Sequence, residues 1–332
     1  MPGSHASSAA ARQIRVLLPL PLPAALDYLA PDGNASPEPG AFVRVPLGPQ
    51  RLVGVVWDDA AAAIPAERAK PILETLAVPA LRPELRRFVD RVALYTMAPP
   101  GAVLRMAMSV REALEPPRPR RGWALSATGR EALAAAAALT SARKRVIELL
   151  RDGPPLPAME IARLAGCGTG VIRDMAARGL VEERLVAAAA SCPPPLDWRK
   201  SGIELTPDQS AAASHLAGRV EARGFGVTLL DGVTGSGKTE AYFAAIAAAL
   251  RAGRQALVLL PEIALGAQWL ARFRERFGAP PAQWHSEIPM AERRDTWRSV
   301  AAGRVPVVVG ARSALFLPFP DLGLIVVDEE HD

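Results

Sequence analysis

The sequence predicts a multidomain protein: a small β-rich domain, a winged helix, and an α/β P-loop (RecA-like) lobe with a parallel sheet. Three observations predict it: turn-separated strand patterns in residues 12–58, three short helices followed by a strand in residues 141–187, and apolar runs alternating with amphipathic segments after residue 227. With 332 residues, half of them hydrophobic, the chain can form two or three cores. The expected parts are a β-rich domain at 12–115, a linker at 116–140, a winged helix at 141–190 and an α/β lobe at 199–332.

The first part combines strands and one helix. Apolar stretches at 14–18, 42–45 and 52–57 are separated by Pro and Gly turn signals, which favours a small barrel or sandwich. Residues 81–97 place apolar side chains on one helical face. The prolines at 116, 117 and 119 then remove backbone donors and fix φ, so a linker is expected there.

The middle part has the pattern of a winged helix. Helices are expected at 142–150, 158–164 and 171–178, followed by a strand to Val186. The segment 116–198 also has 12 basic against 8 acidic residues, the main positive excess of the chain. The third helix could therefore contact DNA through Arg173 and Arg178, or the module could only space domains or bind protein.

The last part has the alternation of a parallel sheet covered by helices. Strands are expected at 227–231, 256–260, 305–309 and 324–327. Amphipathic segments between them are expected to form the covering helices, at 238–250, 265–277 and 290–301.

A complete P-loop motif lies after the first of these strands and opens a helix. Its backbone N–H groups can surround phosphates, Lys238 can reach the β- and γ-phosphates, and the Thr239 hydroxyl can bind Mg²⁺. The glycine spacing does not fit a Rossmann dinucleotide motif. The predicted nucleotide-binding residues are Gly232, Val233, Thr234, Gly235, Ser236, Gly237, Lys238 and Thr239.

Acidic residues follow the last apolar strand, where ligands sit in α/β sheets. Asp328 suits Mg²⁺ together with Thr239, and Glu329 suits orientation or deprotonation of the attacking water; Lys238 and Glu329 are thus the predicted catalytic residues. Upstream, Thr206 is a natural helix N-cap, and Gln209 can read an adenine edge with its amide.

Several function classes are disfavoured. The cysteines, Cys167 and Cys192, and four scattered histidines do not form a zinc-binding spacing, so each Cys is expected to act as a small apolar residue. No apolar stretch suits a membrane span and no secretory signal is recognisable, so a cytoplasmic protein with no membrane partner is expected.

Taken together, these motifs carry a resemblance that spans essentially the whole chain. The segments LTPDQ, GVTGSGKTE, LLPEIAL, GARSALF and VVDEEHD resemble the first half of a superfamily-2 helicase motor, and specifically the PriA family of replication-restart helicases. The stretches LPLPAALDY and GAFVRVPLG resemble that family's 3′-DNA-end-binding domain.

The resemblance implies an ATP- and Mg²⁺-dependent 3′→5′ DNA helicase that recognises stalled forks and restarts replication by primosome assembly. It implies as partners forked DNA with a 3′ end, single-stranded DNA, single-strand-binding protein and other primosome proteins. By position, Leu26, Asp27, Gly40 and Lys70 correspond to the family's 3′-terminal nucleotide pocket, although Leu26 replaces its usual aromatic residue. Arg312 corresponds to a phosphate contact of the motor.

The motifs of the family's second lobe, including its arginine finger, and its zinc-binding cysteines are not found in these 332 residues. The chain is therefore expected to represent an N-terminal half that is inactive alone, with zinc only in the remaining part. Two alternatives stay open: a non-catalytic fork-DNA-binding protein that uses nucleotide as a switch, and a P-loop translocase of another type. The LDY and VRVPLG segments argue against the second alternative.

Overall fold

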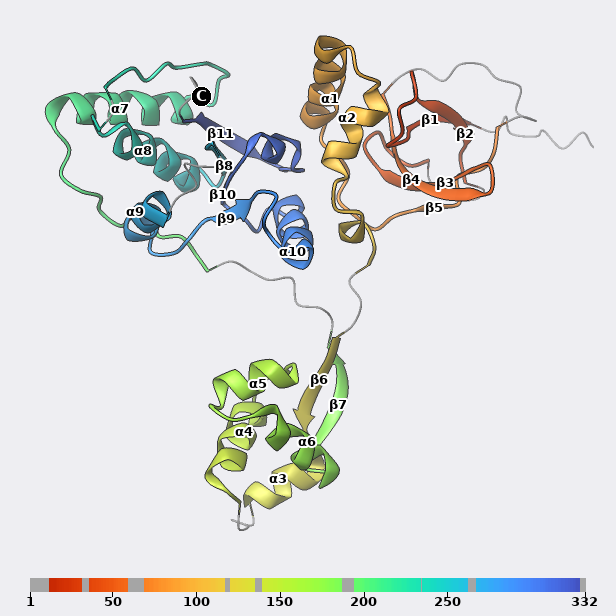
Figure 1. The fold of residues 1–332 in the computed structure, drawn as a ribbon, viewed down its shortest axis with the longest axis vertical. Helices are drawn as coiled ribbons and strands as arrows, with labels where there is room; N and C mark the ends of the chain where they lie inside the picture. Colours follow the sequence, from red (N-terminus) through yellow and green to blue (C-terminus); the bar gives the residue numbers. More distant parts are fainter. Residues whose placement is uncertain are drawn as a thin grey trace, which may run out of the picture. The chain divides into compact units, whose positions relative to one another are not determined.

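The computed structural model describes residues 12–31, 36–58, 69–116, 120–134, 139–186, 194–233, 235–261 and 267–328. The chain divides into two compact units (Figure 1). Unit 1 comprises residues 1–115 and 191–332, and unit 2 comprises residues 116–190. Among the described residues, no helix is long and apolar enough to cross a membrane.

Unit 1 begins with a five-stranded antiparallel sheet in the order β2-β1-β4-β3-β5. A bridge between Leu29 and Pro71 brings the end of β2 to the segment that precedes β5, so the sheet curls into a small barrel. The predicted β-rich domain is thus confirmed. Its strands are β1 (Gln13–Leu17), β2 (Leu26–Leu29), β3 (Phe42–Leu47), β4 (Gln50–Val56) and β5 (Glu74–Thr75).

Two faces of this sheet are apolar. Because successive side chains of a strand alternate, Val16 faces one buried cluster with Val43 and Tyr28, while Leu17 faces another with Phe42. The second cluster includes the helices that follow. These are α1 (Pro83–Thr96), as the sequence predicted, α2 (Pro100–Ala107) and the short 3₁₀ helix η2 (Arg111–Ala113).

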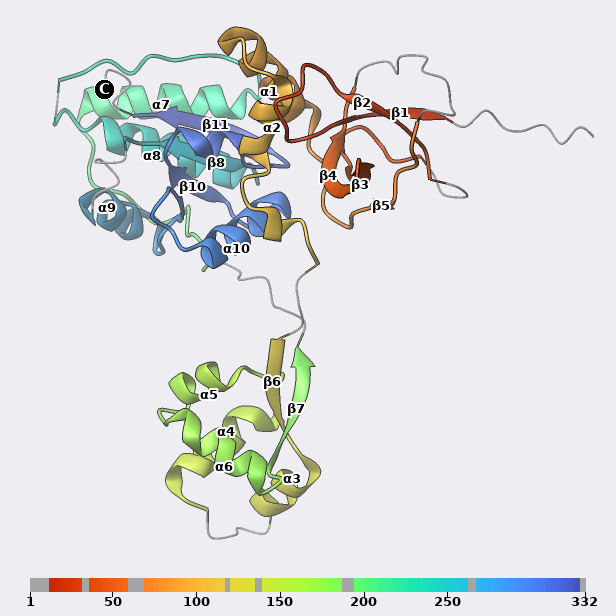
Figure 2. The ribbon, with the colours of Figure 1, turned by 45° about the vertical axis from the view of Figure 1, so that its right-hand side comes forward.

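The second part of unit 1 is an α/β lobe with a parallel sheet in the order β11-β8-β10-β9. Figures 1 and 2 show α7 and α8 lying side by side next to these strands. Alternate strand residues pack on the aromatic side chains of α8 and α9 on one face and on α10 and η3 on the other. The elements are α7 (Pro207–Glu221), α8 (Lys238–Arg251), β8 (Gln255–Leu259), α9 (Ala267–Phe277), β9 (Ala282–Trp284), α10 (Met290–Ala301), β10 (Val307–Gly310), η3 (Arg312–Phe316) and β11 (Leu322–Val327).

One predicted strand of the lobe is wrong in this structure. Residues 227–231 form neither strand nor helix, and Val227 and Leu229 are 86% and 80% exposed. An apolar run indicates that a segment can pair as a strand. A strand forms only when the backbone of a neighbouring edge strand hydrogen-bonds to it. The edge strand β11 keeps Ile325 and Val327 exposed, so its apolar outer surface is also uncovered.

Unit 2 has its own core, formed by residues such as Val146, Ile161 and Met175. The predicted linker at 116–140 is wrong for most of its length, because β6 pairs with β7 and α3 contacts α4. The proline run indicated a break, but the strand directly after it finds its partner some sixty residues later, which no local pattern reveals. The elements are β6 (Arg120–Leu125), α3 (Ala127–Ala134), α4 (Ser141–Arg151), α5 (Ala158–Leu164), α6 (Thr169–Ala177) and β7 (Val181–Val186).

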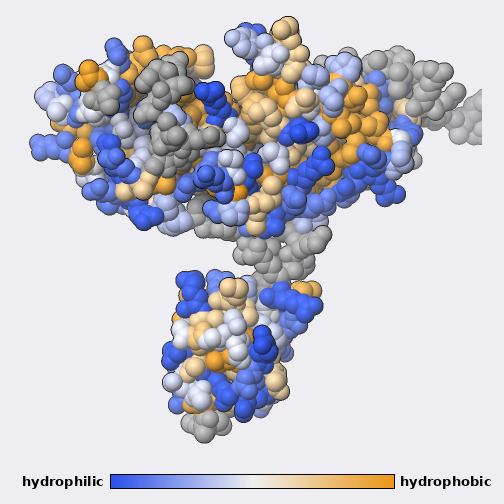
Figure 3. Space-filling model, viewed as in Figure 1, coloured by the Kyte–Doolittle hydropathy of each residue, from blue (hydrophilic) through white to orange (hydrophobic). Residues whose placement is uncertain are grey.

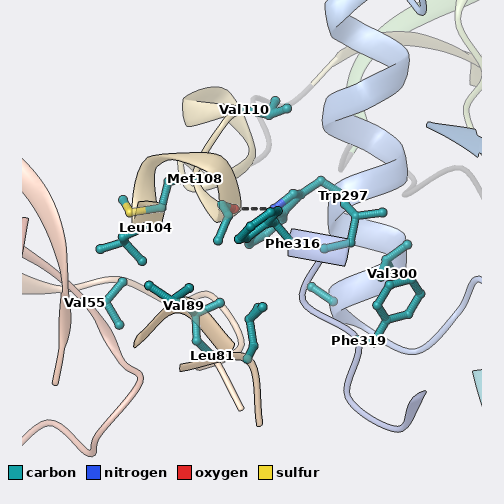
Figure 4. Close-up of a cluster of buried hydrophobic side chains, with 14 of the residues drawn as sticks. Val55, Leu81, Val89, Leu104, Met108, Val110, Trp297, Val300, Phe316 and Phe319 are labelled. Carbon is teal, nitrogen blue, oxygen red and sulfur yellow. Dashed lines mark hydrogen bonds between the residues drawn. The ribbon is translucent and has the colours of Figure 1, made fainter. Parts of the chain in front are cut away.

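A shared core joins the β domain to the α/β lobe within unit 1 (Figure 4). Trp297 of α10 is 1% exposed and donates its indole N–H to the Ala107 carbonyl of α2, 3.1 Å away. The ring of Phe316 in η3 lies 5.2 Å from that of Phe88 in α1. We call this contact between α1, α2 and η2 on one side and α10 and η3 on the other the junction.

Apolar side chains also reach the surface of unit 1. Figure 3 shows orange atoms gathered over the β domain and its two helices. At the end of α1, Leu94, Tyr95 and Met97 are largely exposed.

Candidate functional site

The P-loop leads directly into α8, so that the start of this helix lies at the phosphate-binding motif. Gly235 and Gly237 have φ of 81° and 85°, a left-handed backbone that favours glycine. Gly237 precedes the first residue of α8, and the N-terminal N–H groups of that helix favour an anion. The glycine positions of the motif are thus the positions at which the chain must turn.

Lys238 binds its own loop. Its Nζ donates to the Gly232 carbonyl at 2.6 Å, and the side chain is half-buried. An ammonium has three donors, so this contact leaves capacity for phosphate oxygens. The Ser236 N–H bonds to the Val233 carbonyl and closes the loop.

Gln209 connects α7 to the P-loop. Its Nε2 donates to the Ser236 carbonyl at 2.8 Å and its Oε1 accepts the Thr206 N–H at 3.0 Å. Thr206 in turn accepts the Gln209 N–H, which completes a capping box and confirms the predicted N-cap. One amide hydrogen and one lone pair of Gln209 remain after these bonds.

Asp328 is the last described residue and follows β11. Its backbone N–H bonds to the Leu259 carbonyl of β8 at 3.0 Å, which continues the sheet to this position. Its Oδ2 accepts the Tyr242 hydroxyl at 2.8 Å. Tyr242 comes three residues after Thr239, hence on the same side of α8. Tyr242 therefore connects Asp328 to the helical turn that begins at the P-loop.

Sequence reasoning missed Tyr242 and its second partner, Trp269. The indole Nε1–H of Trp269 donates to the Tyr242 hydroxyl at 2.7 Å, and both side chains are buried. Burial raises the pKa of Tyr242 well above its ordinary value, so the phenol stays protonated and donates to Asp328. The spacing from Thr239 was the one available signal for Tyr242.

The donor set fits Mg²⁺ at a nucleotide. Mg²⁺ in phosphate sites keeps waters and takes one or two protein ligands plus phosphate oxygens, and a hydroxyl with a carboxylate is such a pair. Among the described residues, no three His, Cys, Asp or Glu side chains gather where protein ligands alone could hold a metal ion. Thr234 and Glu329 lie outside the described residues.

In the β domain, the carboxylate of Asp27 is nearly enclosed. The side chain is 9% exposed, and its Oδ1 lies 3.7 Å from Nε of Arg15. This oxygen accepts no hydrogen bond from the part of the chain that the structure describes. A buried carboxylate oxygen without a donor is costly and suits a site where a ligand supplies the donor.

Comparison with known proteins assigns both parts of unit 1. Residues 15–109 match the family of PriA 3′DNA-binding domains, and residues 206–332 match the DEAD/DEAH box helicases. The replication restart protein PriA of Haemophilus influenzae is 33% identical over 96% of this chain and 44% of its own length. PriA of Bacillus subtilis is 37% identical over 54% of the chain and 23% of its own length, and PriA of Rickettsia conorii is 57% identical over 32% and 16%.

The chain belongs to the PriA family. It spans less than half the length of these PriA relatives.

The four residues carried over from the PriA 3′-end pocket lie on or beside the strands of this sheet. Leu26 and Asp27 are neighbours on β2, and the Lys70 carbonyl accepts the Leu29 N–H at the other end of that strand. The Gly40 N–H donates to the Val56 carbonyl of β4. Val56 pairs with Val16 of β1, and Val16 pairs with Leu26 at the start of β2. The shared pocket therefore stays a prediction.

Gly40 has a packing role in the domain. Its φ is 94°, and a Cβ there would lie 2.2 Å from the Leu81 carbonyl oxygen. Its carbonyl accepts the Leu81 N–H, which fixes the entry to α1. The PriA motor segment at 310–316 also has a packing role, because η3 lies at the junction, with Arg312 exposed at its start.

Proposed function

We propose that the α/β lobe binds ATP with Mg²⁺ as part of an ATP-dependent 3′→5′ DNA helicase of PriA type that acts at stalled replication forks. The observation that carries this proposal is the P-loop at the start of α8, with Asp328 bonded to Tyr242 near the start of the same helix. Lys238 and the N-terminus of α8 would bind the phosphates, and the remaining amide groups of Gln209 would read the adenine edge.

Mg²⁺ would be held by Thr239 and Asp328 and would neutralise charge on the phosphates. Glu329 is the proposed residue for orienting the attacking water. This division of roles follows that of P-loop motors generally.

The first test is nucleotide affinity measured by calorimetry with ATP. Lys238→Ala removes a charge-assisted contact and is expected to lower affinity by about 2–3 kcal/mol, or roughly 30- to 150-fold. Lys144→Ala, an exposed lysine of α4, is the matched control and should bind ATP like the wild-type chain. Equal affinity of Lys238→Ala and wild-type chain would rule out the P-loop assignment.

Assayed by itself, the 332-residue chain is expected to bind ATP but to hydrolyse it slowly and not to unwind DNA. The described residues contain one P-loop lobe, and an arginine supplied from outside such a lobe contributes about 10³–10⁵ in rate. DNA-stimulated ATPase activity abolished by Glu329→Gln would contradict this expectation. Binding without turnover in any DNA-bound assembly of the full-length protein would instead favour a nucleotide switch.

We also propose that the β domain binds the 3′ end of DNA. This assignment is supported by Asp27 Oδ1, a buried acceptor to which a terminal 3′-hydroxyl could donate a hydrogen bond. The proposed contacts are Leu26, Asp27, Gly40 and Lys70 for the 3′ end. Arg312 is the proposed contact for single-stranded DNA.

The corresponding test compares a fork with a free 3′-hydroxyl to one with a 3′-phosphate by fluorescence anisotropy. Wild-type chain should prefer the hydroxyl, and Asp27→Asn should lose that preference by about tenfold, because one charge-assisted hydrogen bond contributes about 1.5–3 kcal/mol. Glu74→Gln, an exposed carboxylate of β5, should leave it intact. Equal binding of the two forks by wild-type chain would exclude a 3′-end pocket.

Unit 2 is proposed to be a winged helix. Three helices with a two-stranded sheet of β6 and β7 support this, as does the family context of a DNA-binding protein. Asp174 pairs with both Arg178 and Arg143, so an ion pair already occupies one of the two arginines expected to contact DNA. Single-strand-binding protein and other primosome proteins remain proposed partners.

A further inference from the structure

The hydrogen bonds around Tyr242 determine where its proton goes. A tyrosine hydroxyl has one donor and two acceptor positions. Trp269 Nε1–H can only donate, and it approaches the hydroxyl oxygen at 2.7 Å. The phenolic proton is therefore available for Asp328, whose Oδ2 lies 2.8 Å away.

This proton fixes the direction of the Asp328 carboxylate. The last torsion of an aspartate side chain is soft, so a carboxylate at a strand end can rotate. A hydrogen bond to one of its oxygens selects one rotation. Residues that hydrogen-bond to a metal ligand without touching the metal orient that ligand, and their removal commonly lowers metal affinity about 10- to 100-fold.

Trp269 is itself held firmly. Its ring stacks on Phe273 with centroids 5.3 Å apart and meets Phe243 of α8 edge-on at 5.7 Å. Arg272 of α9 pairs with Glu240, the residue after Thr239, at 2.7 Å, and the Glu240 side chain is 9% exposed. Helices α8 and α9 thus hold the indole N–H at the hydroxyl from two sides.

We propose that Tyr242, held by Trp269, is a positioning residue that orients Asp328 for the Mg²⁺ of the bound nucleotide. This inference rests on the proposed nucleotide site and adds two residues that act on it through Asp328. It assigns α9 a role in the site, although α9 contributes no predicted ligand.

The test measures binding of a fluorescent ADP analogue (mant-ADP) over a series of Mg²⁺ concentrations and in EDTA. Tyr242→Phe keeps the ring but deletes the hydroxyl, and it should raise the Mg²⁺ concentration needed for half-maximal enhancement of binding about tenfold. Its affinity in EDTA should match that of wild-type chain, because Lys238 and the P-loop are untouched. Trp269→Phe keeps the aromatic packing and should shift the Mg²⁺ dependence in the same direction, by about threefold.

Tyr28→Phe is the matched control, because Tyr28 is a buried tyrosine of the β domain whose hydroxyl bonds to the Pro46 carbonyl. It should leave the Mg²⁺ dependence unchanged. An unaltered Mg²⁺ dependence in Tyr242→Phe, or an equal loss of affinity in EDTA, would overturn the positioning role. If wild-type chain does not bind mant-ADP, or Lys238→Ala binds it equally well, the proposed nucleotide site itself fails instead.

Discussion

The β domain and unit 2 both precede most of the α/β lobe in the sequence, yet their hydrophobic cores are formed differently. The β domain shares its core with the lobe, because Trp297, Val300 and Phe316 of the lobe pack with Val89 and Leu104 of the helices that follow the barrel. Among the residues that the structure describes, the core of unit 2 is formed by unit 2 alone.

This difference has a functional consequence. A domain that shares a core with a motor lobe moves with it, whereas a domain with its own core can be displaced at little cost in folding free energy. If the β domain binds a 3′ end, as proposed, that end is held at a fixed place on the lobe. The junction also includes η3, the segment expected to follow single-stranded DNA.

The sharpest way to test this comparison is Trp297→Ala. Trp297 is buried at the junction, so its removal is expected to lower the free energy of unfolding of unit 1 by about 3–5 kcal/mol. Hydrogen exchange of peptides from the β domain and from the lobe should increase together, because both rely on the same core. Exchange in unit 2 should not change.

Met175→Ala provides the reverse experiment. Met175 is fully buried in unit 2, and the cost of about 2–5 kcal/mol should appear there alone. Nucleotide affinity and exchange in unit 1 should stay as in wild-type chain. Loss of protection in both units after either substitution would show that they fold as one, and the comparison would be wrong.

Local sequence patterns predicted the parts of this molecule that depend on near neighbours. The turns and strands of the barrel, the Thr206 cap and the glycine turns of the P-loop follow from residues close in sequence. The junction could not be predicted in this way, because Trp297 and Ala107 are far apart in the chain and an amphipathic helix does not reveal its partner. For the same reason β6 was taken for a linker and residues 227–231 for a paired strand.

The candidate site shows the same limit. The phosphate-binding residues form one continuous motif, so spacing alone identified them. Tyr242, Trp269 and Asp328 come from α8, α9 and the end of β11, and their contact depends on how these elements pack. The steric role of Gly40 at Leu81 is another such contact, because these two residues meet only in the folded domain.

A smaller effect is expected from Asp58→Asn at the barrel side of the junction. Arg86 of α1 is buried and donates to both carboxylate oxygens of Asp58 at 2.8 Å, and it also donates to the carbonyls of Pro39 and Leu81. The Asp58 side chain is 48% exposed, so screening reduces the pair, and the loss is expected to be about 1 kcal/mol.

The pH dependence of this effect has a definite sign. The hydrogen bond from Arg86 lowers the pKa of Asp58 below its ordinary value, although partial burial opposes this. The pair therefore stabilises the fold fully above the unfolded pKa, and this contribution is lost as pH falls through the lower folded pKa. Thermal unfolding should separate wild-type chain from Asp58→Asn at pH 7, and the difference should close in the acid range below about pH 4. A difference that persists at pH 2 would assign the effect to packing.

The smallest effect is expected from Arg298→Lys on the lobe side of the junction. Arg298 of α10 donates to the backbone carbonyls of Glu112, Ala113 and Glu115, which follow α2. A lysine keeps the charge but cannot reach three carbonyls with a planar fork, so two contacts are lost at this half-buried position. We expect a loss of about 0.5 kcal/mol in chemical denaturation, with an unchanged m-value. Arg304→Lys, an exposed arginine beyond the end of α10, is the control and should be neutral.

Because Trp297→Ala and Arg298→Lys change adjacent residues of one helix, the ratio of their effects measures how far the junction depends on apolar burial rather than on polar contacts. A loss from Arg298→Lys as large as that from Trp297→Ala would mean that the β domain is held to the lobe mainly by this fan of hydrogen bonds.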